Sequence, residues 1–177
     1  MGNLLMQMLV ATMTSLKIFG LTLLFSLPLG MLVAKGRMSK NPIISNVVNV
    51  YIMIMRGTPL ILQLLFVYFA PYYIFGSSYD RFTAVIVGYT INYAAYFAEI
   101  YRGGIQSIPV GQYEASLVLG FSKAHTFTHV IAPQVVKRII PAMGNEVITL
   151  VKDTALAQTI GVAELFRVAE NLSLINI

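Results

Sequence analysis

The chain has 177 residues, of which 57% are hydrophobic and only 11% are charged. This balance excludes an ordinary soluble domain and predicts an all-α integral membrane protein. Cysteine is absent from the sequence, so disulfide bonds and thiolate metal sites are excluded as well. The net charge of +5 comes from basic residues that flank apolar runs, as is typical of membrane proteins.

The first apolar run predicts a membrane-spanning helix at 16–34, preceded by a segment at 1–15 that runs along the membrane interface. A span needs about 20 apolar residues. The start of the chain lacks the basic region and small-residue cleavage site of a secretory signal, so we expect it to be retained. The second run, 43–73, exceeds one perpendicular crossing and is interrupted by Arg56-Gly57-Thr58-Pro59.

Two further spans are expected at 82–101 and 139–157, followed by a more polar tail. Basic residues dominate the loop after the first span and the linker between the last two spans, whereas the loop at 71–81 has one Asp and one Arg. The positive-inside rule therefore places the two basic segments in the cytoplasm and the N-terminus outside.

The linker between the third and fourth spans predicts two short helices joined by an elbow, in the stretch GQYEASLVLGFSKAHTFTHVIAPQ. Pro109 suits a first helical turn, and Gly120 suits a left-handed stop. Ser122 can cap the second helix, which Pro133 breaks or bends before the chain re-enters the membrane. Such an amphipathic unit fits a groove on another protein.

At these residues the sequence resembles a family: the permease subunits of bacterial ATP-binding-cassette importers, of the polar amino-acid type. Glu114-Ala115-Ser116, Gly120 and Ile131-Ala132-Pro133 resemble the EAA loop of that family, with Ser116 in place of its second alanine and Ala132 in place of its leucine. Further matches to the amino-acid branch are Arg56-Gly57-Thr58-Pro59 with Gln63, the run AEIYRGGI at 98–105, Pro133-Gln134, and KDTAL at 152–156.

The resemblance implies a type I importer fold with one permease domain at 1–177, which shows four of the five expected spans. It implies a coupling loop at about 106–134, in which Glu114, Ala115, Ser116 and Gly120 contact an ATPase. The implied partners are a second permease subunit, identical or paralogous, two cytoplasmic ATP-binding subunits, an extracytoplasmic solute-binding protein and membrane lipid. ATP and Mg²⁺ are expected on the partner ATPase, with no cofactor in this chain, and the expected location is the bacterial inner membrane.

Polar residues inside otherwise apolar spans predict the substrate path. A carboxylate at that depth costs about 2.5 to 3.5 kcal/mol or more, so Glu146 is expected to face the interior and to pair with a substrate cation or with Arg56. Asp153 is expected either to attract a cationic ligand or to pair with Lys152. For the amides, interhelical hydrogen bonding explains the pattern equally well. The full predicted set is Thr58, Gln63, Asn92, Asn145, Glu146 and Asp153.

Two other kinds of site are weighed at the linker and rejected. A glycine between two short helices also occurs in DNA-binding proteins, but Lys123 is the only Lys or Arg between positions 111 and 134, so no nucleic-acid partner is expected. His125 and His129 share a helix face without a third ligand, so surface packing explains them better than a metal ion.

The sequence gives no sign of catalysis by this chain. It contains neither a G-x-x-x-x-G-K-[ST] phosphate loop nor a plausible Ser-His-Asp set, so any ATP hydrolysis belongs to a partner. Glu99 and Arg102, at helical spacing near the end of the third span, predict a neutralising ion pair rather than a gate. An ion channel and a membrane-embedded enzyme are the alternatives to an importer.

Overall fold

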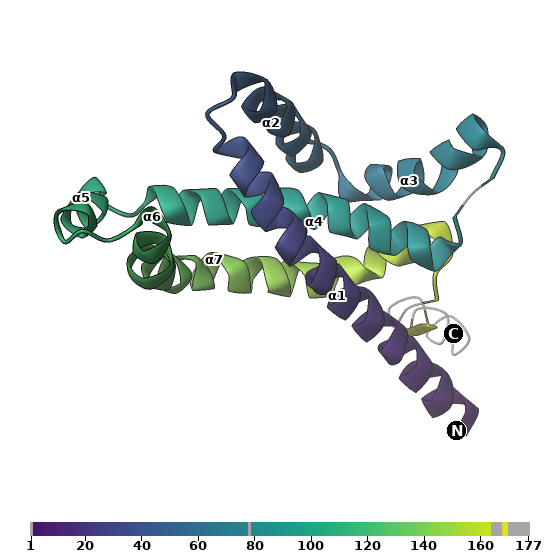
Figure 1. The fold of residues 1–177 in the computed structure, drawn as a ribbon. Helices are drawn as coiled ribbons and strands as arrows, with labels where there is room; N and C mark the ends of the chain where they lie inside the picture. Colours follow the sequence, from purple (N-terminus) through teal and green to yellow (C-terminus); the bar gives the residue numbers. More distant parts are fainter. Residues whose placement is uncertain (1, 78, 164–167, 170–177) are drawn as a thin grey trace.

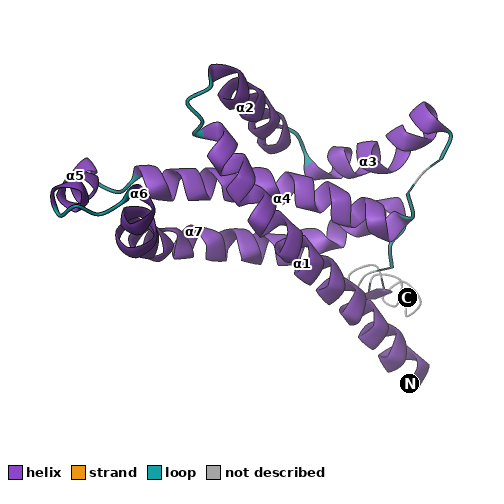
Figure 2. Ribbon diagram, viewed as in Figure 1, coloured by secondary structure: helices purple, strands orange, loops and turns teal. Residues whose placement is uncertain are grey.

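The computed structural model describes residues 2–77, 79–163, 168 and 169, and every regular element in this part of the chain is helical (Figures 1 and 2). Most of the tail after residue 163 lies outside the described residues. The elements in chain order are α1 (Gly2–Arg37), α2 (Pro42–Gly57), α3 (Leu60–Phe75), α4 (Arg81–Gln106), α5 (Val110–Val118), α6 (Lys123–His125), η1 (Thr126–Ile131), α7 (Ala132–Asp153) and η2 (Thr154–Ile160). Among these, η1 is a π-helical segment and η2 is a 3₁₀ helix.

The centre of the fold is α4, which α1 crosses at close range (Figure 1). The contact face of α1 carries a small residue at every fourth position: Thr22, Ser26, Gly30 and Ala34. A Cβ atom on Gly30 would lie 2.9 Å from Phe97 Cβ and 3.2 Å from the Ala94 carbonyl oxygen. The two backbones therefore approach closely, which is how helices associate in a lipid bilayer without a hydrophobic driving force.

The first apolar run forms one continuous helix. A separate interfacial segment at 1–15 is therefore wrong, because α1 continues without a break from Gly2 to Arg37. Among the described helices, only α1 is long and apolar enough to cross a membrane by itself, over Leu5–Arg37.

The second apolar run is not one straight span. It forms α2 and α3, which meet at 110° and reach the length and hydropathy of a span only when taken together. Pro59 causes the break, because it has no N–H to donate to the carbonyl of Met55 and it disfavours a helical Thr58. Thr58 is accordingly extended, with φ −118° and ψ 148°.

The two remaining predicted spans exist as helices with different ends. The third extends past residue 101 to Gln106 as α4. The fourth begins earlier than predicted, at Ala132, and its last residues, from Thr154 onward, form η2 instead. Both helices are less apolar than α1 because they carry more polar side chains. Asn92 on α4 is buried, whereas Lys137 and Arg138 on α7 are exposed.

The predicted helix, elbow and helix form as α5, Gly120 and α6. The φ of Gly120 is +76°, a left-handed conformation that an L side chain adopts with strain. Phe121 N–H donates to the Ser116 carbonyl and Gly120 N–H to the Leu117 carbonyl, which is the Schellman pattern at a helix end. Ser122 Oγ then accepts a hydrogen bond from His125 N–H at 3.3 Å and caps α6, as predicted.

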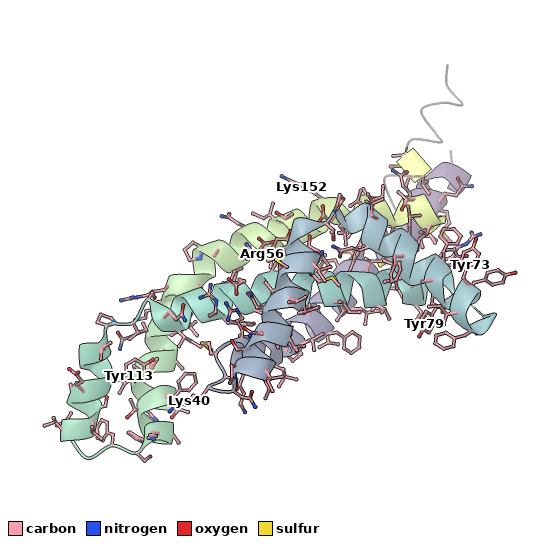
Figure 3. The ribbon with its side chains drawn as sticks, turned by 90° about the horizontal axis from the view of Figure 1, so that it is seen from above. Lys40, Arg56, Tyr73, Tyr79, Tyr113 and Lys152 are labelled. Carbon is pink, nitrogen blue, oxygen red and sulfur yellow. The ribbon has the colours of Figure 1, made fainter. Side chains whose placement is uncertain are left out.

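A break at Pro133 does not occur, although the axis turns there. The helix passes from η1 directly into α7, and Figures 1 and 3 show the two running in different directions. In η1 the hydrogen bonds reach back five residues, so that Ala132 N–H donates to the Phe127 carbonyl. Pro133 then falls in the first turn of α7, where a missing N–H is tolerated.

Replacing Gly30 tests the α1–α4 contact. We expect Gly30→Ala to lower the stability of the folded protein by about 1 to 3 kcal/mol, because the added methyl group meets Phe97 Cβ and the Ala94 backbone. Gly20→Ala is the matched control on the same helix, since a Cβ atom there has nothing within 4 Å. Thermal unfolding of the purified protein in detergent measures both, and equal melting temperatures would contradict this packing.

Candidate functional site

The site begins at the break between α2 and α3, where backbone carbonyl groups lose their helical partners. Gln63 Nε2 donates to the carbonyls of Met55 (3.0 Å) and Thr58 (3.1 Å) and to Thr58 Oγ1 (2.7 Å). Asn92 Nδ2, from α4, donates to the same Met55 carbonyl (3.0 Å) and to Gln63 Oε1 (2.9 Å). The two amides thus replace the donor that Pro59 lacks, so hydrogen bonding within the protein explains both residues.

Beside this break lies a cavity of about 140 Å³ between the start of α3, the middle of α4 and the second half of α7. This volume corresponds to about four or five water molecules at about 30 Å³ each. Polar and aromatic side chains dominate its lining, which consists of Thr58, Leu60, Asn92, Tyr93, Tyr96, Glu146, Thr149 and Asp153. The fold therefore forms a polar chamber between these helices, open on the side where Thr58 and Thr149 are exposed.

Two carboxylates of α7 face this chamber. Tyr93 donates its hydroxyl to Asp153 Oδ2 at 2.6 Å, so that the Asp153 side chain is oriented by α4. Asp153 does not pair with Lys152, and neither Asp153 nor Glu146 forms a salt bridge among the described residues. The lining of the chamber therefore has two carboxyl groups and neither Lys nor Arg.

One helical turn further along α4, a third carboxylate is neutralised within the chain. Glu99 accepts two hydrogen bonds from Arg102, from Nε at 2.9 Å and from Nη2 at 2.6 Å. Arg56 Nη1 lies 3.7 Å from Glu99 Oε2, and the Arg56 guanidinium lies over the ring of Tyr96. The predicted Glu99–Arg102 ion pair is confirmed, and the predicted Arg56–Glu146 pair is replaced by Arg56–Glu99.

The predicted substrate-path residues therefore divide into three groups. Thr58, Asn92, Glu146 and Asp153 line one cavity. Gln63 does not line the cavity itself, but it forms hydrogen bonds with two residues that do, Thr58 and Asn92. Asn145 is exposed and is not among the residues that line the chamber, and its backbone carbonyl accepts a hydrogen bond from the Thr149 hydroxyl.

The sequence did not predict four of the lining residues: Leu60, Tyr93, Tyr96 and Thr149. A tyrosine inside an apolar helix resembles an ordinary core residue. Tyr89, one turn before Tyr93 on α4, is indeed buried in the core. A usable signal was the spacing, because Asn92, Tyr96 and Glu99 recur at helical intervals and so share one face of α4.

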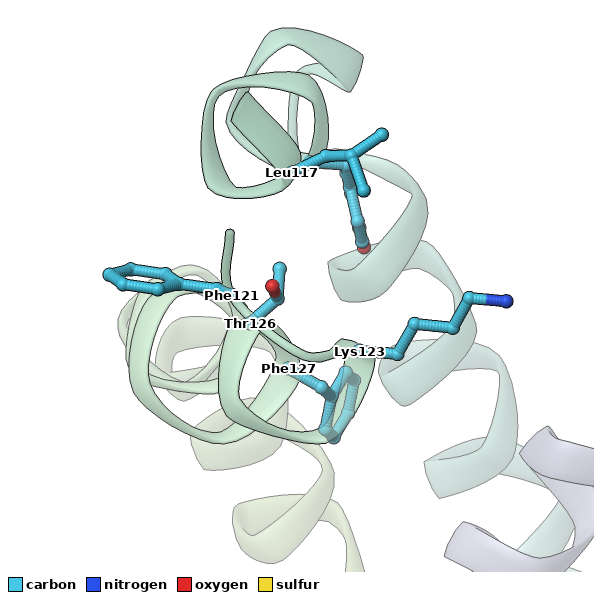
Figure 4. A pocket seen from close by; sticks show the side chains of 6 residues that line it. Leu117, Phe121, Lys123, Thr126 and Phe127 are labelled. Carbon is cyan, nitrogen blue, oxygen red and sulfur yellow. The ribbon is translucent and has the colours of Figure 1, made fainter. Parts of the chain in front are cut away.

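The second predicted site is the α5 elbow, at the opposite end of α7 from the chamber. Glu114 and Ala115 are exposed, whereas Ser116 is buried and donates its hydroxyl to the Gln112 carbonyl at 2.8 Å. Between α5 and the following helix lies a largely apolar hollow of about 380 Å³, with Leu117 on one side and Phe121 and Phe127 on the other (Figure 4). Large apolar side chains on α5 remain exposed: Val110, Leu117, Val118 and Leu119 just after it.

The two histidines next to this elbow stack on one another, with ring centroids 4.1 Å apart. Within the described ranges, the structure has no group of three or more residues able to hold a metal ion. The ring of His125 also meets Phe121 edge to face, and His129 Nδ1 lies 2.8 Å from Thr128 Oγ1, so local packing and hydrogen bonding account for both histidines.

The sequence matches the model of the family described as "Binding-protein-dependent transport system inner membrane component" over residues 26–177. The chain belongs to this family. A putative glutamine transport system permease protein of Rickettsia felis is 37% identical over 163 residues, which cover 92% of this chain and 75% of that protein. An L-cystine transport system permease protein of Bacillus subtilis is 39% identical over 157 residues, or 89% and 67% of the two chains.

Among solved structures, the fold matches one described as an amino acid ABC transporter with histidines. The TM-score is 0.87 at 37% identity, and the match covers 96% of this chain and 79% of the other. The predicted all-helical importer-permease fold and the predicted transport role are thereby confirmed. The chain is an inner-membrane transport component, which favours the importer hypothesis over its two alternatives, an ion channel and a membrane-embedded enzyme.

Replacing Gln63 tests whether its side-chain amide stabilises the helix break by donating to the free carbonyl groups. Gln63→Met keeps the length of the side chain but leaves the Thr58 carbonyl without its side-chain donor, so we expect a loss of about 1 to 3 kcal/mol in stability. Gln7→Met, at an exposed position of α1, is the control. Thermal unfolding in detergent distinguishes them, and an unchanged melting temperature for Gln63→Met would show that the amide is dispensable.

Proposed function

We propose that this chain is the permease subunit of an ATP-driven importer of polar amino acids and that its substrate passes through the α3–α4–α7 chamber. The observation that carries the proposal is the pair of carboxylates, Glu146 and Asp153, which face a polar cavity without a salt bridge to any described residue. Relatives named for glutamine and cystine transport, and a matching amino-acid transporter structure, support this substrate class.

The lining suits the chemistry of an amino acid. An unpaired carboxylate inside a membrane protein is costly unless it meets water or a cation, so Glu146 favours the ammonium group or a cationic side chain. The ring of Tyr96 can add a cation–π contact, and the hydroxyls of Thr58 and Thr149 can hydrogen bond a polar side chain. An uncharged apolar solute would gain little here, which supports selection for polar substrates.

The proposed topology follows from the basic loops. Lys35, Arg37 and Lys40 lie at the α1–α2 turn, and Lys123, Lys137 and Arg138 lie around the α6–α7 end. The positive-inside rule supports a cytoplasmic position for both, with the N-terminus and the α3–α4 loop outside. In this orientation α5 projects into the cytoplasm.

The partners follow from the proposed mechanism. A second permease subunit would complete the pathway, a solute-binding protein would deliver the amino acid, and two cytoplasmic subunits would bind ATP and Mg²⁺. The exposed apolar residues of α5, with the exposed Glu114 among them, support docking of this helix into a groove on the ATPase. Glu114 can form a charge-assisted contact there, and the left-handed Gly120 sets the angle between the two helices.

The chamber is tested by Glu146→Gln, which removes the charge and keeps the shape. We expect uptake to fall, or the preference to shift away from cationic amino acids, while the complex still assembles and hydrolyses ATP. Asn145→Ala is the control, since that neighbouring side chain is exposed and lies outside the chamber. Uptake of several amino acids into vesicles of equal permease content measures this. Unchanged kinetics for Glu146→Gln would make the residue structural.

The elbow is tested by Gly120→Val, which forces a β-branched side chain into a positive φ. We expect the permease to remain in the membrane and to lose ATPase attachment or ligand-stimulated hydrolysis. Gly103→Val is the control, because that glycine lies in α4 with open space around it and without a positive φ. Copurification with the ATPase and stimulated hydrolysis are the two measurements. Normal stimulation in Gly120→Val would contradict coupling through this elbow.

A further inference from the structure

The chamber described above explains how a cation is held, but every amino acid also carries an α-carboxylate. Burying that group next to Glu146 and Asp153 without a positive partner would be strongly unfavourable. We propose that Arg56 binds the α-carboxylate of the substrate. When the substrate enters, the ion pair between Arg56 and Glu99 breaks and Arg56 pairs with the substrate instead. This inference rests on the proposed function, since it concerns the same chamber.

Arg56 is placed for this role at the edge of the chamber. It occupies the last turn of α2, directly before the helix break (Figure 3). Its guanidinium carbon lies 5.3 Å from the ring centroid of Tyr96, and Tyr96 lines the cavity together with Glu146 and Asp153. A substrate between α4 and α7 therefore has carboxylates on one side and a guanidinium on another.

The guanidinium of Arg56 is also available. Its contact with Glu99, at 3.7 Å, is longer than a charge-assisted hydrogen bond of about 2.7 to 2.9 Å. Arg56 makes none of the side-chain hydrogen bonds found in the described part of the chain, and 43% of its side chain is exposed. A planar fork of five N–H donors, none of them engaged in a short bond, matches the geometry of a carboxylate.

Arg102 is the other guanidinium at this level, and it is not available. Two of its nitrogens hold Glu99 and a third donates to Gln106 Oε1 at 2.6 Å. This arrangement also permits the exchange, because Glu99 keeps its bidentate partner after Arg56 leaves. No carboxylate is then left buried and unpaired, so the exchange avoids the cost of a broken internal ion pair.

This exchange of ion-pair partners would couple substrate binding to the contact between α2 and α4. Arg56 belongs to α2 and Glu99 to α4, so their ion pair joins two helices next to the 110° bend. When a substrate carboxylate pairs with Arg56, a contact through the ligand replaces this direct contact between the helices. A substrate without a carboxylate cannot form that contact, so the affinities of the free acid and of its carboxamide are compared in the test.

The test measures binding to the permease–ATPase complex in lipid nanodiscs, without the solute-binding protein, by isothermal titration calorimetry. The probes are L-arginine, L-histidine and L-glutamine, each compared with its own α-carboxamide, which lacks the negative charge. For any of the three that binds, we expect the wild-type complex to prefer the free acid by about tenfold or more, as the loss of one charged hydrogen-bonded pair predicts.

Arg56→Gln is expected to bring this preference close to one, through weaker binding of the acid and unchanged binding of the amide. Arg56→Lys keeps the charge without the planar fork and should give an intermediate preference. If the Arg56→Gln complex does not assemble, the Arg56→Lys variant provides the test. Arg102→Lys is the matched control, because Arg102 contacts the same Glu99 oxygen, and it should keep the wild-type ratio.

The outcomes separate the two hypotheses. A wild-type ratio in both Arg56 variants, or an equal loss in Arg102→Lys, overturns the role of Arg56 and leaves the amino-acid chamber intact. If none of the three amino acids binds the wild-type complex, the proposed substrate class is wrong and the role of Arg56 falls with it.

Discussion

A helix that breaks inside a membrane leaves backbone carbonyl groups that must be satisfied by the protein itself, and this constraint organises the structure. At Pro59 the carbonyls of Met55 and Thr58 lose their ordinary partners, and Gln63 and Asn92 supply the replacements. Because Asn92 comes from α4, the repair also ties the bend to the central helix. The bend, the two amides and one wall of the chamber are therefore a single arrangement.

The central helix, α4, is able to serve two neighbours because its faces differ in chemistry. Toward α1 it presents Ala94, Ala98 and the backbone, which meet the small residues of that helix at close range. Toward α7 it presents Asn92, Tyr93 and Tyr96, which line the chamber. The close contact on one side holds α4 in place, so that the polar side chains on the other side keep a defined geometry.

Charge is distributed unevenly along the α4–α7 groove. Glu99 is surrounded by two guanidinium groups, so its charge is balanced within the chain. Glu146 and Asp153 face the cavity without a salt bridge to any described residue, and Asp153 accepts a hydrogen bond from the Tyr93 hydroxyl. Because an uncompensated carboxylate at membrane depth is unfavourable, the second arrangement supports the proposal that a cationic group of the substrate enters the cavity.

The sequence by itself determined the helical membrane class, the elbow and several chamber residues, because each depends on local chemistry. Apolar length, the positive φ that Gly120 provides and the cost of burying Glu146 can all be read from single positions or short patterns. The family resemblance added the transport role through motifs at 56–59, 98–105 and 114–133, and the comparisons confirmed it.

Only the tertiary structure decided which of these residues meet. The sequence showed an interruption at Pro59 but not the 110° angle, since that angle depends on how α3 packs against α4. It grouped Asn145 with Glu146 because they are adjacent, although a helix turns adjacent side chains by about 100° and so only one of them faces the chamber. It also proposed Glu146 as the partner of Arg56, whereas the structure places Arg56 next to Glu99. That choice follows from the long-range packing of α2 against α4, which no local pattern encodes.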